Sequence, residues 1–173
     1  MSESSRKHKE TAPKRLKFAV ITCSSSRYRK LKQGKSVEDP SGDFIAETLE
    51  SNGHKVVFRK AIPDDLARIR EDVSSLLTSN EVDAVIVCGG TGISPSDVTI
   101  EAVQPLLNKV LPGFGELFRW LSYEEIGSPA ILTRALAGVA NGKAVFCIPG
   151  STEAVRLCVE KFILPEMLLS QKV

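Results

Sequence analysis

The chain has 173 residues, of which 42% are hydrophobic, and this size and composition suit one compact globular domain. Residues 1–14 are almost entirely polar, so they lack the apolar core of a signal peptide, and no later run is long enough to cross a bilayer. We therefore expect a cytoplasmic protein that makes no contact with a membrane.

The net charge of +2 is concentrated near the start of the chain, where Arg6, Lys7, Lys9, Lys14 and Arg15 outnumber the acidic residues. The remaining body is close to neutral. A basic segment can bind nucleic acid, but this one has no interleaved aromatic residues and no basic body behind it. We predict that residues 1–15 form a disordered basic tail and that the protein binds no nucleic acid.

Two periodicities alternate along residues 16–173, which we predict to form a single domain. Short apolar runs indicate strands, and apolar residues at helical spacing indicate helices. The predicted strands span 16–22, 55–58, 82–87 and 144–148, and the predicted helices span 41–51, 64–79 and 151–164. This order is typical of a three-layer α/β/α fold with a mostly parallel sheet, whose ligands bind at the carboxyl ends of the strands.

The most informative segment follows the predicted strand at 82–87, where the sequence reads Gly-Gly-Thr-Gly over residues 89–92. Glycines let the backbone approach a ligand closely, and the amides of such a turn form a concave anion site. Asp97 stands just beyond this turn, and a carboxylate beside a phosphate site needs a cation between them. The pair predicts a Mg²⁺-nucleotide or another metal-bridged phosphate. The alternative is a plain strand-to-helix turn with Asp97 solvated in the first helical turn.

A second turn of this kind is Pro149-Gly150-Ser151, which again leads from a strand into a helix. The Ser151 hydroxyl can cap that helix, and the same helix N-terminus can bind an anion, so both interpretations stay open.

Residues 111–119 lie between these two turns and contain Pro112, Gly113 and Gly115. We predict that they form a bent loop that approaches a ligand and leads into a helix carrying Arg119. The alternative is an ordinary turn that places Phe114 in the core.

The four cysteines are Cys23, Cys88, Cys147 and Cys158, and each lies in or at the end of an apolar segment. No C-x-x-C spacing or paired histidine indicates a metal site. We expect buried free thiols in a reducing compartment. A reactive role for Cys23 or Cys88 stays open, because both could approach the same edge of the sheet.

Five motifs occur in one order along the chain: GGTG followed by Asp97, then PGFGELFR, LSYEEIG, SPAILTRALAGVA and IPGST. In order and spacing they resemble the MoaB/Mog family of molybdenum cofactor biosynthesis proteins, and in particular its MoaB branch. The resemblance extends from residue 16 to about residue 168.

The resemblance implies a Mg²⁺- and ATP-dependent adenylylation of molybdopterin. The terminal phosphate of the pterin attacks the α-phosphate of ATP, which yields adenylated molybdopterin and pyrophosphate. It also implies a homotrimer or a dimer of trimers, with other molybdenum cofactor biosynthesis proteins as further partners. Alternative functions are a non-catalytic molybdopterin carrier, a structural or regulatory oligomer, and a nucleotide pyrophosphatase.

The resemblance makes Asp64 and Asp97 the catalytic carboxylates and the Mg²⁺ ligands. Either Arg119 or Arg134 could bind phosphate through its planar guanidinium. The residues expected to bind the substrates are Gly89, Gly90, Thr91, Gly92, Ser41, Gly42, Pro112, Gly113, Gly115, Glu116, Arg119, Pro149, Gly150 and Ser151.

One segment departs from the family pattern. Ser24, Ser25 and Arg27 stand where the family more usually has S-D-R or S-N-R. Residues 28–35 then look like an insertion, with four cationic side chains. The boundary of this loop is left open by the sequence.

Overall fold

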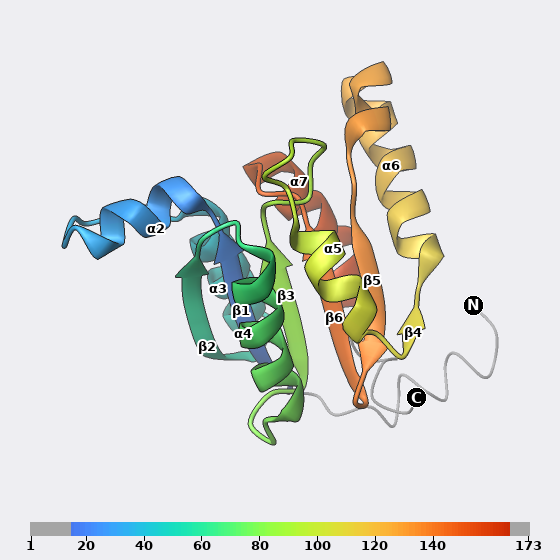
Figure 1. The fold of residues 1–173 in the computed structure, drawn as a ribbon. Helices are drawn as coiled ribbons and strands as arrows, with labels where there is room; N and C mark the ends of the chain where they lie inside the picture. The colour runs from blue at the N-terminus through green and yellow to red at the C-terminus, as the bar shows by residue number, and fades with distance from the viewer. Residues whose placement is uncertain (1–14, 167–173) are drawn as a thin grey trace.

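A six-stranded sheet forms the centre of the protein in the computed structural model, which describes residues 15–166 (Figure 1). The strand order across the sheet is β2-β1-β3-β6-β5-β4. The strands are β1 (Lys17–Cys23), β2 (Lys55–Ile62), β3 (Ala84–Cys88), β4 (Lys109–Val110), β5 (Leu136–Ala140) and β6 (Lys143–Ile148). β2, β1, β3 and β6 run parallel, whereas β5 runs antiparallel to both β6 and β4. The predicted α/β fold with a mostly parallel sheet is confirmed.

Helices cover both faces of the sheet, which gives the three layers (Figure 1). α3, α6 and α7 pack on one face, and α4 and α5 pack on the other. The helices are α2 (Ser25–Lys32), α3 (Pro40–Ser51), α4 (Leu66–Thr78), α5 (Thr99–Val103), α6 (Pro112–Ile126) and α7 (Thr152–Cys158). Shorter turns are η1 (Gln104–Leu106) and η2 (Ser128–Leu132), and α7 continues into η3 (Val159–Ile163) and α8 (Leu164–Glu166).

The central strands are buried on both faces, and their side chains alternate between two apolar clusters. In β1, Phe18 and Val20 join the cluster under α3, α6 and α7, while Ala19 and Ile21 join the cluster under α4 and α5. Parallel strands covered on both sides need apolar residues at every position. This is why these strands were visible in the sequence as continuous apolar runs.

The antiparallel end of the sheet was not expected. β5 and β6 form a hairpin whose turn is Asn141-Gly142, and both turn residues have positive φ, 51° and 72°. An Asn-Gly pair is the residue choice that favours a tight hairpin turn. The sequence therefore carries a local signal for this hairpin, although no strand was predicted before it. α2 and β4 were not predicted either, whereas α5 is the helix expected after the glycine turn.

The bent loop predicted at residues 111–119 is wrong, because α6 begins at Pro112. Proline suits the first helical position, where its missing N–H loses no hydrogen bond. Gly115 lies so close to the backbone just before β5 that an added Cβ would be 2.7 Å from the carbonyl oxygen of Ala135. Phe114 packs against the core beside Phe146, as the alternative interpretation held.

Two further sequence predictions concern the basic tail and the absence of a membrane-spanning segment. The basic tail proposed for residues 1–15 lies, except for Arg15, outside the described residues. Across residues 15–166, no helix combines the length and the apolar character that a bilayer crossing requires.

The second apolar cluster allows a test of the packing. Ile69 on α4 is 0% exposed, whereas Leu66 on the same helix is 38% exposed. Ile69→Ala should lower the free energy of unfolding by about 2–5 kcal/mol, because it removes buried apolar contacts and leaves a cavity. Leu66→Ala is the control and should cost less than about 1 kcal/mol. Equal effects in urea denaturation would contradict this packing.

Candidate functional site

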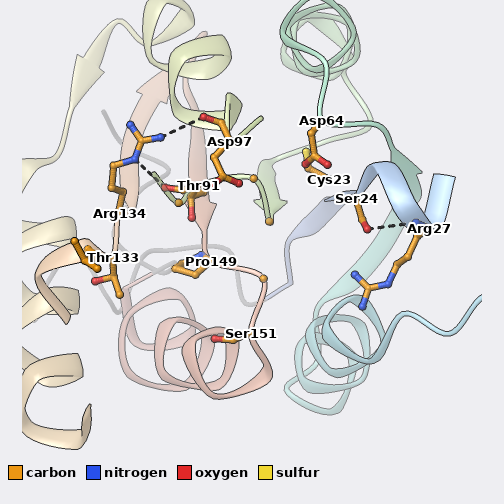
Figure 2. Close-up of a pocket in the computed structure, with 15 residues that line it drawn as sticks. Cys23, Ser24, Arg27, Asp64, Thr91, Asp97, Thr133, Arg134, Pro149 and Ser151 are labelled. Carbon is orange, nitrogen blue, oxygen red and sulfur yellow. Dashed lines mark hydrogen bonds between the residues drawn. The ribbon is translucent and has the colours of Figure 1, made fainter. Parts of the chain in front are cut away.

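A cavity of about 430 Å³ lies where β1, β3 and β6 end (Figure 2). The start of α2, the segment before α4 and the connection from η2 to β5 complete its walls. Its lining residues are Cys23, Ser24, Arg27, Asp64, Gly89, Gly90, Thr91, Gly92, Asp97, Leu132, Thr133, Arg134, Pro149, Gly150 and Ser151. The structure thus brings together the glycine turn, both predicted carboxylates and the Pro149-Gly150-Ser151 turn.

The glycine turn lies against the backbone at the end of β1. Gly89 has a φ of 96°, and an added Cβ would lie 2.5 Å from the carbonyl oxygen of Cys23. A Cβ added at Gly90 would lie 2.6 Å from Thr99 Oγ1. Thr99 also fixes the turn, since its hydroxyl donates to the carbonyl of Gly89 at 2.8 Å and its N–H donates to that of Gly90 at 2.9 Å. Side chains cannot be accommodated here, so the turn keeps its backbone close to the cavity.

Asp64 is held by the start of α2. The backbone N–H and the hydroxyl of Ser25 both donate to Asp64 Oδ2 at 2.8 Å, and the N–H of Asp64 donates to Ser25 Oγ at 2.9 Å. Asp64 Oδ1 accepts no hydrogen bond from any residue in the described part of the chain. This carboxylate is therefore fixed through one oxygen and has the other available.

Asp97 is fixed in the same way by a tight turn. The N–H of Ser94 donates to Asp97 Oδ2 at 2.9 Å, and the N–H of Asp97 donates back to the carbonyl of Ser94 at 2.8 Å. α5 begins only at Thr99, and its cap residue Val98 makes no side-chain bond. The carboxylate of Asp97 is turned back to Ser94 and is not part of the first helical turn, so the alternative of a solvated helix-start residue does not hold.

Figure 2 shows the carboxylates of Asp64 and Asp97 facing the cavity from two sides. Over residues 15–166 there is no cluster of three or more histidine, cysteine or acidic residues that could hold a metal. Mg²⁺ does not require one, because it is often bound by one or two carboxylates, with water and substrate phosphate as the other ligands. The available oxygens of Asp64 and Asp97 fit that donor set.

Arg134 fastens the loop that carries Asp97. Its Nε donates to the carbonyl of Thr91 at 2.9 Å, and its Nη2 donates to that of Asp97 at 3.4 Å. Its Nη1 pairs with Glu101 Oε1 at 2.6 Å, and this bond lowers the pKa of the Glu101 carboxyl from its ordinary value. The sequence offered Arg134 as a phosphate ligand. In the structure it holds the two ends of the loop from Thr91 to Asp97 and also lines the cavity, so its predicted contact with phosphate remains a prediction.

Ser41 and Gly42 support the cavity from behind its wall. The buried Ser41 hydroxyl donates to the carbonyl of Gly150 at 2.8 Å, and so connects α3 to the Pro149-Gly150-Ser151 turn. The N–H of Gly42 donates at 3.2 Å to Asp39, which caps α3. Neither residue lines the cavity, so their predicted contact with substrate remains a prediction.

The predicted residues of α6 also lie apart from the cavity in this single chain. Pro112, Gly113, Gly115, Glu116 and Arg119 are all on this helix, which runs along the sheet edge formed by β5 and β4 (Figure 1). Their predicted role in substrate binding has no support from the geometry of one chain.

Five lining residues were not predicted: Cys23, Ser24, Arg27, Leu132 and Thr133. The first three follow β1 or end it, and the loop that leaves the end of a parallel strand was the available signal. The other two come before β5, and no signal could place them without knowledge of the reversed strand.

Comparison with known proteins gives the family. Residues 19–168 match the family described as "Probable molybdopterin binding domain". The chain belongs to this molybdopterin-binding family. The molybdenum cofactor biosynthesis protein B of Bacillus cereus is 45% identical to it over 161 residues, which are 92% of this chain and 91% of that protein. The predicted membership of the MoaB/Mog family is confirmed.

One further related sequence and one related crystal structure support membership of the molybdopterin-binding family. A protein of Methanocaldococcus jannaschii named "Probable molybdopterin adenylyltransferase" is 40% identical over 147 residues, which are 85% of this chain and 87% of that protein. A crystal structure of a molybdenum cofactor biosynthesis protein B matches with a TM-score of 0.83 and 43% identity, over 93% of this chain and 96% of that one.

The cysteines of this molybdopterin-binding chain are buried free thiols, as expected. Burial raises the pKa of Cys23 to about 12 and that of Cys88 to about 12, although Cys23 lines the cavity. A thiol with so high a pKa is almost entirely protonated near neutral pH, and the thiolate is the reactive form. Burial thus disfavours the thiolate at both residues, which supports the expectation of structural thiols.

The contacts of Arg134 can be tested by hydrogen exchange. Arg134→Lys keeps the charge but loses the planar guanidinium that reaches two carbonyls and a carboxylate. The backbone amides of residues 90–97 should then exchange faster in a mass-spectrometric measurement. Arg156→Lys, in which the arginine stacks on Phe44 instead, is the control and should leave this loop unchanged. Unaltered exchange in Arg134→Lys would show that Arg134 does not hold the loop.

Proposed function

We propose that this protein catalyses the Mg²⁺- and ATP-dependent adenylylation of molybdopterin. An oxygen of the pterin's terminal phosphate forms a bond with the α-phosphorus of ATP, the bond to the β-phosphate breaks, and pyrophosphate leaves. The observation that carries the proposal is the cavity that Asp64 and Asp97 both line beside a glycine turn. The adenylyltransferase name of the relative from Methanocaldococcus jannaschii supports it.

The cavity suits this reaction because nucleotidyl transfer needs positioned phosphates and neutralised charge more than covalent help. The turn from Gly89 to Gly92 holds its backbone at the cavity surface, where amides can bind phosphate oxygens. The helix N-terminus after Pro149-Gly150-Ser151 adds a favourable potential for a second phosphate. Asp64 and Asp97 would hold Mg²⁺, which supplies positive charge to the phosphate oxygens when it is bound.

The two carboxylates allow the sharpest test of this reaction. Asp64→Asn and Asp97→Asn keep the size of the side chain but remove the charge that a cation requires. Each should slow pyrophosphate release at saturating ATP, Mg²⁺ and molybdopterin by about a hundredfold or more, with folding and pterin binding preserved.

Asp65→Asn is the matched control for this test. Asp65 is adjacent to Asp64 but caps α4, its carboxylate accepting from the N–H of Arg68 at 2.8 Å. Asparagine caps helices about as well, so turnover should stay near that of the wild type. If Asp64→Asn and Asp97→Asn each kept more than about a third of the wild-type rate, the carrier function would replace catalysis.

We also propose that the protein is a homo-oligomer, either a trimer or a dimer of trimers. α6 and η2 expose large apolar side chains, among them Leu117 at 51%, Trp120 at 60% and Ile131 at 81%. A contiguous exposed apolar surface of this kind favours an interface.

Sedimentation velocity at micromolar concentration should give the mass of three or six chains. Trp120→Glu should lower it, because a charge would then be buried in an apolar interface. Lys55→Glu, at the opposite edge of the sheet, is the control and should leave the mass unchanged. A folded wild-type monomer under these conditions would be inconsistent with the proposed oligomer.

A further inference from the structure

α2 differs from the other long helices because it projects away from the sheet (Figure 1). It has eight residues, and none of them is buried. The segment from Ser24 to Val37 contains no acidic residue. Its cationic side chains are Arg27, Arg29, Lys30, Lys32 and Lys35. A nearly neutral protein thus concentrates positive charge on one exposed arm.

The two arginines of this arm are partly engaged. Arg27 Nε donates to the carbonyl of Glu38 at 3.1 Å, and Arg29 Nε donates to that of Ser25 at 3.2 Å. The three lysines differ from them. Lys30, Lys32 and Lys35 have no side-chain hydrogen bond or ion pair with any residue from 15 to 166, although Lys32 lies 5.3 Å from the centre of the Tyr28 ring. Their charges are uncompensated within the described chain.

Packing does not explain why so many cationic side chains gather on α2 and at Lys35. A helix this short gains little from propensity alone, and neighbouring like charges on one helix face disfavour it. Cations in the last turn suit the helix dipole, which offsets part of this cost. Lys35 lies beyond the helix and gains nothing from the dipole. An anionic partner would compensate the remaining repulsion.

The start of α2 is part of the cavity wall. Ser24 and Arg27 line the cavity, and Ser25 holds Asp64. Lys30 follows Ser25 by five residues, a distance of about 8 Å along the helix axis. It also shares a helix face with Arg27, because residues three apart are neighbours on the surface. The positively charged helix therefore begins at the cavity wall.

Inside the cavity, Asp64 and Asp97 repel a nucleoside triphosphate until a cation neutralises them. Arg27 and Arg134 also line the cavity, and positive charge outside it would add to the attraction of the approaching substrate. We propose that α2 and Lys35 form an electrostatic arm that attracts the triphosphate chain of the nucleotide to the cavity. The inference rests on the proposed function for the identity of the anion.

The test compares two variants of equal net charge. Lys30→Gln/Lys32→Gln/Lys35→Gln removes the three unpaired charges of the arm. The control, Lys55→Gln/Lys109→Gln/Lys161→Gln, removes three exposed lysines outside the arm, two of which begin β2 and β4. None of the six residues has been placed in the catalytic machinery.

The measured quantity is the association rate of a fluorescent ATP analogue with Mg²⁺, followed by stopped flow over a series of salt concentrations. In the arm variant this rate should fall about three- to tenfold at low salt, and the difference should shrink as salt screens the charges. The control should behave as the wild type. In the turnover assay, kcat/KM for ATP should fall in parallel while kcat stays the same.

Equal association rates in the arm variant and the control would overturn the inference, since net charge alone would then explain any loss. Unchanged nucleotide kinetics together with weaker retention of the arm variant on immobilised poly-glutamate would overturn it in favour of an acidic protein partner. The association rate requires no turnover. If the wild-type protein bound the analogue but released no pyrophosphate, the proposed function would be rejected. The comparison of association rates would still decide whether α2 and Lys35 attract the nucleotide.

Discussion

The organisation of the site depends on the contact between the glycine turn after β3 and the end of β1. The two strands are parallel neighbours in register, with Thr22 opposite Cys88, so both chains leave the sheet at the same level. The backbone of Gly89 then lies against the carbonyl of Cys23, and an added Cβ at Gly90 would lie 2.9 Å from Asp64 Oδ1. The glycine turn therefore fixes how closely the chain segments after β1 and β3 approach each other, and it also limits the position of the Asp64 carboxylate.

The acidic residues near the cavity fall into two groups by their hydrogen bonds. In one group both carboxylate oxygens are used to hold the fold together, and in the other group one oxygen remains available for chemistry. Asp39 uses both oxygens, since Oδ2 accepts from Thr22 Oγ1 at 2.7 Å and from Arg59 at 3.2 Å, while Oδ1 accepts from Gly42. Asp64 and Asp97 each use one oxygen to fix their orientation, and the other accepts no hydrogen bond from residues 15–166. A group that is positioned but not neutralised can bind a cation without reorganisation, which is the condition for efficient electrostatic catalysis.

Features encoded by adjacent residues were predicted from the sequence, and features made by distant partners were not. The buried parallel strands and the glycine turn before Asp97 are local patterns, and the structure has them where they were expected. Arg134 was seen only as a loose candidate, because its partners Thr91 and Glu101 lie 43 and 33 residues away. The start of α6 was missed for the opposite reason. Local glycines indicated a loop, but the close approach of α6 to Ala135, just before β5, requires a glycine inside the helix.

The reversed direction of β5 has a consequence for where the chain can be altered. The four parallel strands all end on the cavity's side of the sheet, but β5 begins on that side and runs away from it to the Asn141-Gly142 hairpin. The segment from Leu132 to Arg134 reaches the cavity only because of this reversal. The hairpin turn lies at the far end of the same strand, separated from the cavity by the length of the sheet. It is therefore the natural attachment point for a fluorescent label or an inserted peptide that must report on the protein without disturbing the site.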